Sequence, residues 1–337
     1  MLPTRAVGRL GLRLPAITYG AMGISWGYET AISGAEVATA DALLDASLAA
    51  GCSAVVTARI YTGAAGAPHN EELVGRALAR HGRAALTVIT KIGVDLSAKP
   101  PFVQSPAQLR AELAASLAAL GTDYVDVLVL NRPDPRIPIA ETMAVFNEFR
   151  AAGKARYFGL SEASAAEIRA AHAVCPLSLI EQEYSLLTRD LEAELLPTVR
   201  ELGIGVLAYS PLSRGLLAGS LPSGAAGKFD FRAVSPRFAG EALAANLAAA
   251  AALAARAAAR GCTPAQLCLA WLLAQGDDVV PCPGSTKLQR LAENFGAAEV
   301  KLTADEAAEL RAAVAEGTGD RYAGMHGTFN SKGAAAH

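Results

Sequence analysis

The stretch that decides the fold is residues 86–130, LTVITKIGVDLSAKPPFVQSPAQLRAELAASLAALGTDYVDVLVL. It begins with an apolar, β-branched run at Leu86–Thr90 and continues through a helical pattern rich in alanine and leucine at Ala107–Leu120. It ends in a second apolar run at Tyr124–Leu130. Short apolar runs on both sides of a helical stretch are typical of a parallel strand–helix–strand unit.

The same alternation continues along the chain in both directions. The dipeptides Ser105-Pro106 and Thr263-Pro264 each place a capping hydroxyl before a helix-initiating proline. Eight apolar runs interleaved with helical patterns predict one (β/α)8 barrel, with residues 1–337 as a single domain. The predicted strands are Pro15–Tyr19, Ser53–Thr57, Leu86–Thr90, Tyr124–Leu130, Ala155–Gly159, Leu177–Gln182, Gly205–Tyr209 and Val279–Pro281. The predicted helices include Ala35–Ala50, Asn70–His81, Ala107–Leu120, Ile139–Ala152, Ala163–Val174, Asp190–Leu202, Pro264–Ala274 and Lys287–Phe295.

Three segments fall outside these units. Arg5–Leu14, with glycines in its middle, predicts a small hairpin that closes the floor of the barrel. Ser213–Gly240 is a long loop after the seventh strand, and long loops in this position are usually functional. The small and polar residues 319–337 predict a flexible tail that could still fold over a site.

Composition excludes several functional classes. Hydrophobic residues make up 52% of the chain and charged residues 18%, which is enough apolar material for a large core. A net charge of −2 provides no basic field for nucleic acid or anionic lipid. The alanine-rich stretch Glu241–Arg260 contains Asn246 and Arg256, so we expect it to be too polar to span a membrane.

The five cysteines are scattered and have no metal-binding spacing. This pattern suits reduced thiols in a cytoplasmic protein, and it predicts no metal site. The sequence leaves the oligomeric state open.

The chemistry of a (β/α)8 barrel lies at the carboxyl ends of its strands. Lys91 directly follows the run LTVIT, and a lysine at the end of a buried strand is costly unless it is paired or functional. The alternative is a lysine whose ammonium group reaches the solvent at the rim. Tyr61 lies four residues beyond the second predicted strand, where a tyrosine taken alone would more often serve packing.

Six further stretches follow one another along the chain: HNEELVGRAL (69–78), TDYVDVLVLNRPDP (122–135), GKARYFGLSEAS (153–164), QEYSLLTRDLE (182–192), ELGIGVLAYSPLSRGLL (201–217) and PGSTKLQRLAENFGA (283–297). Taken together and in this order, they resemble the aldo-keto reductases, and the resemblance covers nearly the whole chain. It implies the same barrel, NADP(H) as cofactor and a small carbonyl or alcohol compound as substrate.

The resemblance also implies a catalytic group. In that family a tyrosine donates a proton to the carbonyl, a lysine lowers the pKa of the tyrosine, an aspartate pairs with the lysine and a histidine orients the carbonyl. Tyr61 then takes the role of the proton donor and Lys91 the role of its modulator. A phenol has a pKa of about 10, so it needs a neighbouring cation to work near neutral pH.

Two of the four positions depart from the family pattern. The aspartate position is Val56, and the histidine position is Asn131. Asparagine before Arg-Pro-Asp-Pro resembles the β subunits of voltage-gated potassium channels, a branch that binds NADP(H) and retains only slow reductase chemistry. The Asn131 amide can still donate to a carbonyl oxygen, which attenuates the chemistry without removing it.

The loss of the aspartate is the more serious departure. Removing one partner of a buried ion pair typically costs about 3–5 kcal/mol, so Lys91 must lose its proton, find another carboxylate or contact the cofactor. On the sixth strand, Glu181 stands where the family has the glutamine that holds the nicotinamide carboxamide. Either Glu181 supplies the negative charge that Val56 lacks, or the change is drift in a site under relaxed demand.

The predicted cofactor site is better preserved. By resemblance, the nicotinamide-side pair is Ser161 and Glu162, and the loop that covers the pyrophosphate contributes Tyr209, Ser210, Leu212 and Arg214. The last barrel helix opens with Gly284, Ser285 and Lys287, followed by Arg290, Glu293 and Asn294. Backbone amides at a helix start together with two cations suit a 2′-phosphate, which favours NADP(H) over NAD(H). The alternative for this stretch is a solvated helix face.

Three residues of the loops extend this site. Arg232, in the long loop, could also reach the cofactor. Trp26 and Tyr28 follow the first strand, where they either form a wall of a substrate pocket or are ordinary loop aromatics.

Three functions fit this pattern. The first is an NADP(H)-dependent carbonyl reductase with attenuated chemistry that uses Tyr61, Lys91 and Asn131. The second is a dehydratase or isomerase on the same barrel that uses Tyr61, Lys91 and Glu181 as acid–base groups. The third is a binding subunit that senses the nicotinamide nucleotide.

Overall fold

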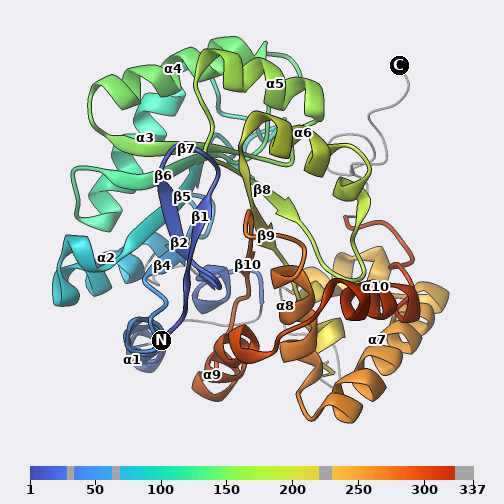
Figure 1. The fold of residues 1–337 in the computed structure, drawn as a ribbon. Coiled ribbons are helices and arrows are strands. Elements are labelled where there is room, and N and C mark those ends of the chain that lie inside the picture. The colour runs from blue at the N-terminus through green and yellow to red at the C-terminus, as the bar shows by residue number, and fades with distance from the viewer. Residues whose placement is uncertain (29–33, 63–68, 220–229, 323–337) are drawn as a thin grey trace.

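Eight parallel strands form one sheet whose order follows the chain, from β3 to β10 (Figure 1). The computed structural model describes residues 1–28, 34–62, 69–219 and 230–322. Backbone N–H groups of Thr18 and Gly20 donate to the carbonyls of Pro281 and Pro283 at 3.0 Å each, which joins the first strand to the last. The predicted (β/α)8 barrel is therefore confirmed. The strands of the barrel are β3 (Tyr19–Gly20), β4 (Ala54–Val56), β5 (Thr87–Ile92), β6 (Val125–Leu130), β7 (Ala155–Ser161), β8 (Leu179–Glu183), β9 (Gly205–Tyr209) and β10 (Val279–Cys282).

Helices surround the sheet on its outer face (Figure 1). Ser105 accepts a hydrogen bond from the backbone of Gln108, and Thr263 accepts one from Gln266, so both predicted caps are present. The α-helices are α1 (Gly34–Ala49), α2 (Asn70–His81), α3 (Pro106–Leu120), α4 (Ile139–Ala151), α5 (Ala165–Val174), α6 (Leu195–Leu202), α7 (Gly240–Arg260), α8 (Pro264–Leu273), α9 (Leu288–Gly296) and α10 (Ala304–Ala313). Short 3-10 helices are η1 (Met22–Ile24), η2 (Arg83–Ala85), η3 (Asp190–Glu192), η4 (Ser213–Ala218), η5 (Phe231–Val234), η6 (Pro236–Phe238) and η7 (Ala297–Glu299).

The first barrel strand is shorter than the sequence predicts. Pro15 ends strand β2 (Leu12–Pro15), which pairs antiparallel with β1 (Thr4–Val7) in a hairpin, and the barrel strand itself begins only at Tyr19. Side chains of this hairpin, including Val7, belong to the apolar cluster that fills the barrel interior. The predicted hairpin at the floor of the barrel is therefore confirmed, and the predicted strand Pro15–Tyr19 is wrong at its start.

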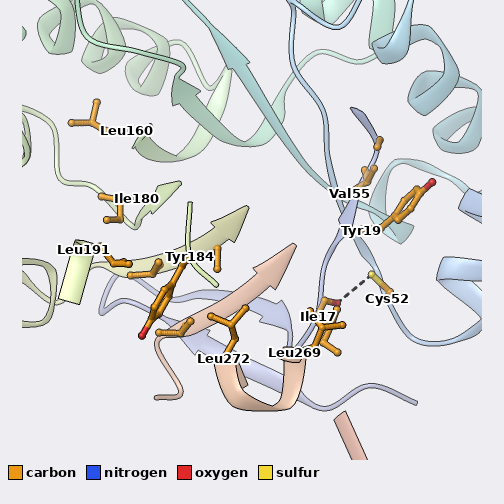
Figure 2. Close-up of a cluster of buried hydrophobic side chains, with 14 of the residues drawn as sticks. Ile17, Tyr19, Cys52, Val55, Leu160, Ile180, Tyr184, Leu191, Leu269 and Leu272 are labelled. Carbon is orange, nitrogen blue, oxygen red and sulfur yellow. Dashed lines mark hydrogen bonds between the residues drawn. The ribbon is translucent and has the colours of Figure 1, made fainter. Parts of the chain in front are cut away.

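Alternation along the strands divides the core into two layers. Val56 points into the barrel, whereas Val55 joins the layer between the sheet and the helices. Figure 2 shows part of this outer layer, where Val55 and Tyr19 lie near Cys52, whose thiol donates to the Ile17 carbonyl at 3.3 Å. On β5, Ile89 points inward, so Lys91 two residues later also faces the interior.

Helix α7 tests the expectation about the membrane. By length and composition it is long and apolar enough to cross one, with a mean hydropathy of 1.5 in its most apolar window, so the prediction that this stretch is too polar is wrong. Its buried side includes Asn246 and Leu253, and Asn246 donates to the backbone carbonyl of Arg237 at 3.0 Å. A helix that packs on the core of a soluble protein passes the same test, which makes this weak evidence for a membrane span.

Candidate active site

The ammonium group of Lys91 lies inside the barrel, 3.1 Å from Oε1 of Glu181. It also donates to the backbone carbonyl of Thr57 at 3.0 Å. Lys91 is only 3% exposed and Glu181 only 4%. Burial disfavours the ammonium form, but the Glu181 carboxylate and the neighbouring Tyr61 together outweigh it and raise the pKa of Lys91. Of the three outcomes for Lys91, the structure shows a replacement carboxylate that comes from strand β8.

Tyr61 packs directly against this ion pair. The Lys91 ammonium lies 5.1 Å from the centre of the Tyr61 ring, so the two residues meet as the resemblance implies. Burial raises the pKa of the Tyr61 phenol, Lys91 lowers it and Glu181 raises it again, with a net value above that of free tyrosine. The carboxylate that stabilises Lys91 therefore also weakens the effect of Lys91 on Tyr61.

A buried asparagine fixes the loop that carries Tyr61. The backbone N–H of Asn70 donates to the Tyr61 carbonyl at 3.2 Å, and its Oδ1 accepts from the Thr57 hydroxyl at 2.7 Å. Its Nδ2 donates to the Ala21 carbonyl and the Ser25 hydroxyl. Asn70 was missed as a site residue, although it lies within the stretch HNEELVGRAL that carries the resemblance.

Asn131 follows strand β6 at the same end of the barrel, and its backbone N–H donates to the Ile92 carbonyl at 2.9 Å. Its side chain is buried, and its Nδ2 has no hydrogen-bond partner among the described residues. The same holds for Oε2 of Glu181. An unsatisfied buried polar atom costs about 1–3 kcal/mol, so a free donor and a free acceptor here indicate a site for a polar ligand.

Aromatic side chains border Tyr61. The Trp26 ring stacks on the Tyr61 ring with 5.3 Å between centres, and Phe231 meets Trp26 edge-on at 4.8 Å. Trp26 therefore lies beside the proposed proton donor, and Phe231 was missed by the sequence analysis. Tyr28 lies slightly apart, under the Arg232 guanidinium at 5.2 Å.

Of the predicted nicotinamide-side residues, Ser161 ends strand β7 and Glu162 directly follows it. Glu162 has a left-handed backbone conformation with φ 57°, which is strained for a side-chain-bearing residue. Its carboxylate accepts from the Tyr209 hydroxyl at 2.8 Å and from both terminal nitrogens of Arg321 at 2.9 and 2.6 Å. Burial alone would raise the pKa of Glu162, but Arg321, Arg132 and the Tyr209 hydroxyl together outweigh it and lower the pKa to about 2. The Ser161 hydroxyl accepts from Arg132 at 2.8 Å.

Arg321 belongs to a segment near the end of the chain, Gly317–Tyr322, which we call the C-terminal segment. Asn246 of α7 exchanges two hydrogen bonds with the backbone of Thr318, at 2.8 and 3.0 Å. At the far end, the hydroxyl of Tyr322 lies 3.1 Å from that of Tyr209. The sequence predicted a flexible tail from residue 319, but the structure holds its first residues against the site, and residues 323–337 lie outside the described part.

The loop after β9 has three more strained residues. Ser210, Ser213 and Arg214 have φ values of 47°, 48° and 57°. Arg214 is nearly buried, and its Nη1 donates to the Arg321 carbonyl at 3.1 Å. Leu212 is half-buried and precedes η4. Strained backbone clusters at ligand sites, which supports a binding role for this loop.

The predicted phosphate end lies at the start of α9. Gly284 pairs with Gly20 of β3, and the Ser285 hydroxyl accepts from the Lys287 backbone at 3.1 Å. Lys287 and Arg290 are both exposed. Glu293 is half-buried, and Asn294 is buried. Two exposed cations at a helix start fit a phosphate group and fit a solvated helix face equally well.

Comparisons with known proteins agree with this architecture. The sequence model of the Aldo/keto reductase family matches residues 16–315. Probable aldo-keto reductase 1 from Glycine max is 36% identical over 325 residues, which cover 94% of this chain and 90% of that protein.

Solved structures are similar as well. A thermostable aldo-keto reductase in complex with the inhibitor epalrestat has a TM-score of 0.73 at 26% identity, over 92% of this chain and 99% of that one. Glycerol dehydrogenase from Gluconobacter oxydans has a TM-score of 0.79 at 27% identity, over 94% of this chain and 97% of that one. The family model covers most of the sequence and the relatives span nearly its full length, so the chain belongs to the aldo-keto reductase family.

Proposed function

We propose that the protein is an NADP(H)-dependent oxidoreductase that acts on a small carbonyl or alcohol compound. The observation that carries this proposal is the buried Lys91–Glu181 ion pair against the ring of Tyr61. It supplies a phenol, a permanent cation and a charge-balancing carboxylate without the aspartate that the family has at position 56.

Each side chain then has a defined role. Tyr61 transfers its proton to the carbonyl oxygen during reduction, and Lys91 stabilises the phenolate that remains. The free Nδ2 of Asn131 donates to the same oxygen and orients the carbonyl. Glu181 keeps Lys91 charged, at the cost of a higher pKa for Tyr61. We expect slow proton transfer for this reason.

The residues present fit a nicotinamide cofactor. The unpartnered Oε2 of Glu181 can accept from a carboxamide N–H, and the strained loop from Ser210 to Arg214 can cover a pyrophosphate. Lys287 and Arg290 can hold a 2′-phosphate, which selects NADP(H) over NAD(H). The bound cofactor would supply the hydride for the carbonyl carbon.

The experiment is a two-part assay of the purified protein. NADPH should quench protein fluorescence, and its absorbance should fall when a panel of aldehydes and ketones is added. Tyr61→Phe should reduce the rate of NADPH loss by at least about a hundredfold, as expected for a general acid, while the fluorescence quenching remains. If the parent protein neither binds nor consumes NADPH, the proposal is wrong.

A second candidate is a nicotinamide-sensing binding subunit. The raised pKa of Tyr61 and the valine at position 56 favour it, because both weaken chemistry without affecting the predicted phosphate contacts. Fluorescence quenching without NADPH consumption across the panel would support this candidate. As part of the proposal, we expect the protein to work in the cytoplasm on a small molecule, without nucleic acid.

A further inference from the structure

The C-terminal segment brings a cation to Glu162, which the resemblance places on the nicotinamide side of the cofactor site. Arg321 holds both oxygens of Glu162, at 2.9 and 2.6 Å, and the side chains of both residues are only 2% exposed. A nicotinamide ring at this position would therefore meet an ion pair and not a lone carboxylate.

Burial makes the ion pair between Arg321 and Glu162 costly to separate. Separating two buried partners leaves two uncompensated charges, which is far less favourable than opening an exposed pair. The Arg321 backbone is held as well, since its carbonyl accepts from Arg214 at 3.1 Å and from the Ser235 hydroxyl at 3.4 Å. Arg321 is therefore expected to remain on Glu162 when a ligand enters.

The carboxylate keeps room for a ligand even in the closed pair. Its Oε1 accepts from Tyr209, from Arg321 and from the backbone N–H of Glu183 at 3.2 Å. Within the described ranges, Oε2 accepts only from Arg321, and a carboxylate oxygen can accept a second donor. Arg321 thus leaves one acceptor free and fixes its direction.

The ion pair also changes the net charge beside a bound nicotinamide ring. The nicotinamide ring is a cation in oxidised NADP and neutral in reduced NADPH. A lone carboxylate beside the ring would favour the oxidised form, whereas a neutralised one would not. Three more arginines (Arg132, Arg214 and Arg237) and the carboxylate of Glu183 lie in the same buried cluster, so the charge balance depends on every member.

We infer that Arg321 is a positioning residue that orients the Glu162 carboxylate toward the cofactor and cancels its charge, so that the site does not overstabilise the oxidised nicotinamide. This inference rests on the proposed binding of NADP(H). It gives the C-terminal segment a part in cofactor binding.

The test measures the dissociation constants of NADPH and NADP+ for four proteins by fluorescence titration. They are the parent, Arg321→Met, Glu162→Gln and the double variant. Arg321→Met should raise the ratio of the NADPH constant to the NADP+ constant by on the order of tenfold, the effect of removing one positive charge from a partly buried site. Glu162→Gln should lower the ratio, and the double variant should return it close to the parent value.

The outcomes separate the possible failures. Binding in the parent with the same ratio in Arg321→Met overturns the inference, because a purely structural role weakens both forms alike. An unfolded Arg321→Met still leaves Glu162→Gln, whose unchanged ratio would overturn it too. No binding by the parent refutes the proposed function instead. Arg169→Met, at an exposed ion pair between α5 and α6, is the matched control and should leave both constants unchanged.

Discussion

At the scale of single residues, the buried ammonium group of Lys91 is balanced by a carboxylate from an unexpected strand. The family aspartate would come from strand β4 beside Lys91, where this chain has Val56 packed among the apolar side chains of the barrel interior. Glu181 supplies the carboxylate from β8, on the opposite side of the closed barrel from β4. Lys91 therefore has a carboxylate partner, and this partner comes from another strand than the resemblance implies.

Glu181→Gln should therefore destabilise the protein by about 3–5 kcal/mol, because Lys91 stays buried without a carboxylate. Urea unfolding at pH 7 measures this change in the free energy of unfolding. Adding Val56→Asp to the same variant should recover most of the loss, since it returns a carboxylate to the position that the family uses. Equal stability of the single variant and the parent would show that the pair contributes nothing.

Glu162 makes a contribution to the stability of the protein that is lost at acid pH. Its pKa falls from the usual 4.5 to about 2 in the folded state, so the stabilisation is present above pH 4.5 and is lost as the pH falls toward 2. The difference in the free energy of unfolding between the parent and Glu162→Gln should decrease by about 3 kcal/mol as the pH falls from 4.5 to 2. Urea unfolding at several pH values measures this decrease. Glu309→Gln, at an exposed position of α10, should show no such narrowing.

Individual residues also mark the limit of prediction from sequence. The motifs of the family placed Tyr61, Lys91 and Asn131 at one end of the barrel, and the structure brings Tyr61 and Lys91 together. The pairing of Lys91 with Glu181 remained one of several options because it depends on distances across the barrel. Asn70 lay in a quoted motif, but its role follows from four contacts that no local pattern contains.

At the scale of elements, the sequence predicts the features that hydrogen bonds between neighbouring residues determine. Caps such as Thr263 before Pro264 fix the start of α8 by a bond within one turn. The C-terminal segment could not be predicted in this way, because its small and polar residues resemble a mobile tail and its partners are distant in the sequence. The predicted start of the first barrel strand was wrong for a related reason. Pro15 pairs with β1 and so belongs to the hairpin, and this pairing is between residues that are not neighbours in the sequence.

Thr263→Ala should cost about 1 kcal/mol, because the hydroxyl oxygen that accepts the backbone N–H of Gln266 is lost. Thermal unfolding followed by circular dichroism measures the effect as a lower Tm. Thr263→Ser keeps the oxygen and should remain within a few tenths of a kcal/mol of the parent. A drop of equal size in both variants would indicate a packing role for the threonine methyl group.

At the scale of the whole molecule, the barrel is closed at its floor by the hairpin of β1 and β2. A Cβ atom on Gly205 of β9 would lie 2.4 Å from a methyl carbon of Val7 and 3.1 Å from the Gly8 nitrogen. The glycine is therefore required for the hairpin to sit against the strand ends.

Gly205→Ala should lower the free energy of unfolding by about 1–3 kcal/mol, because the new methyl group forces the hairpin away from β9. Gly23→Ala is the control, since its added carbon would meet nothing nearer than 3.6 Å. Urea unfolding of both variants checks the difference. Similar stability of the two would mean that the hairpin adjusts without loss.

The contact between Arg321 and Glu162 spans 159 positions of the chain. During folding, its partners can meet only after the intervening strands and helices have assembled, since loop closure over such a span is slow until the barrel has formed. The proposed nucleotide site would therefore form later than the hydrophobic collapse of the barrel. A refolding chain would regain its compactness first and the charge balance of its proposed nicotinamide site last.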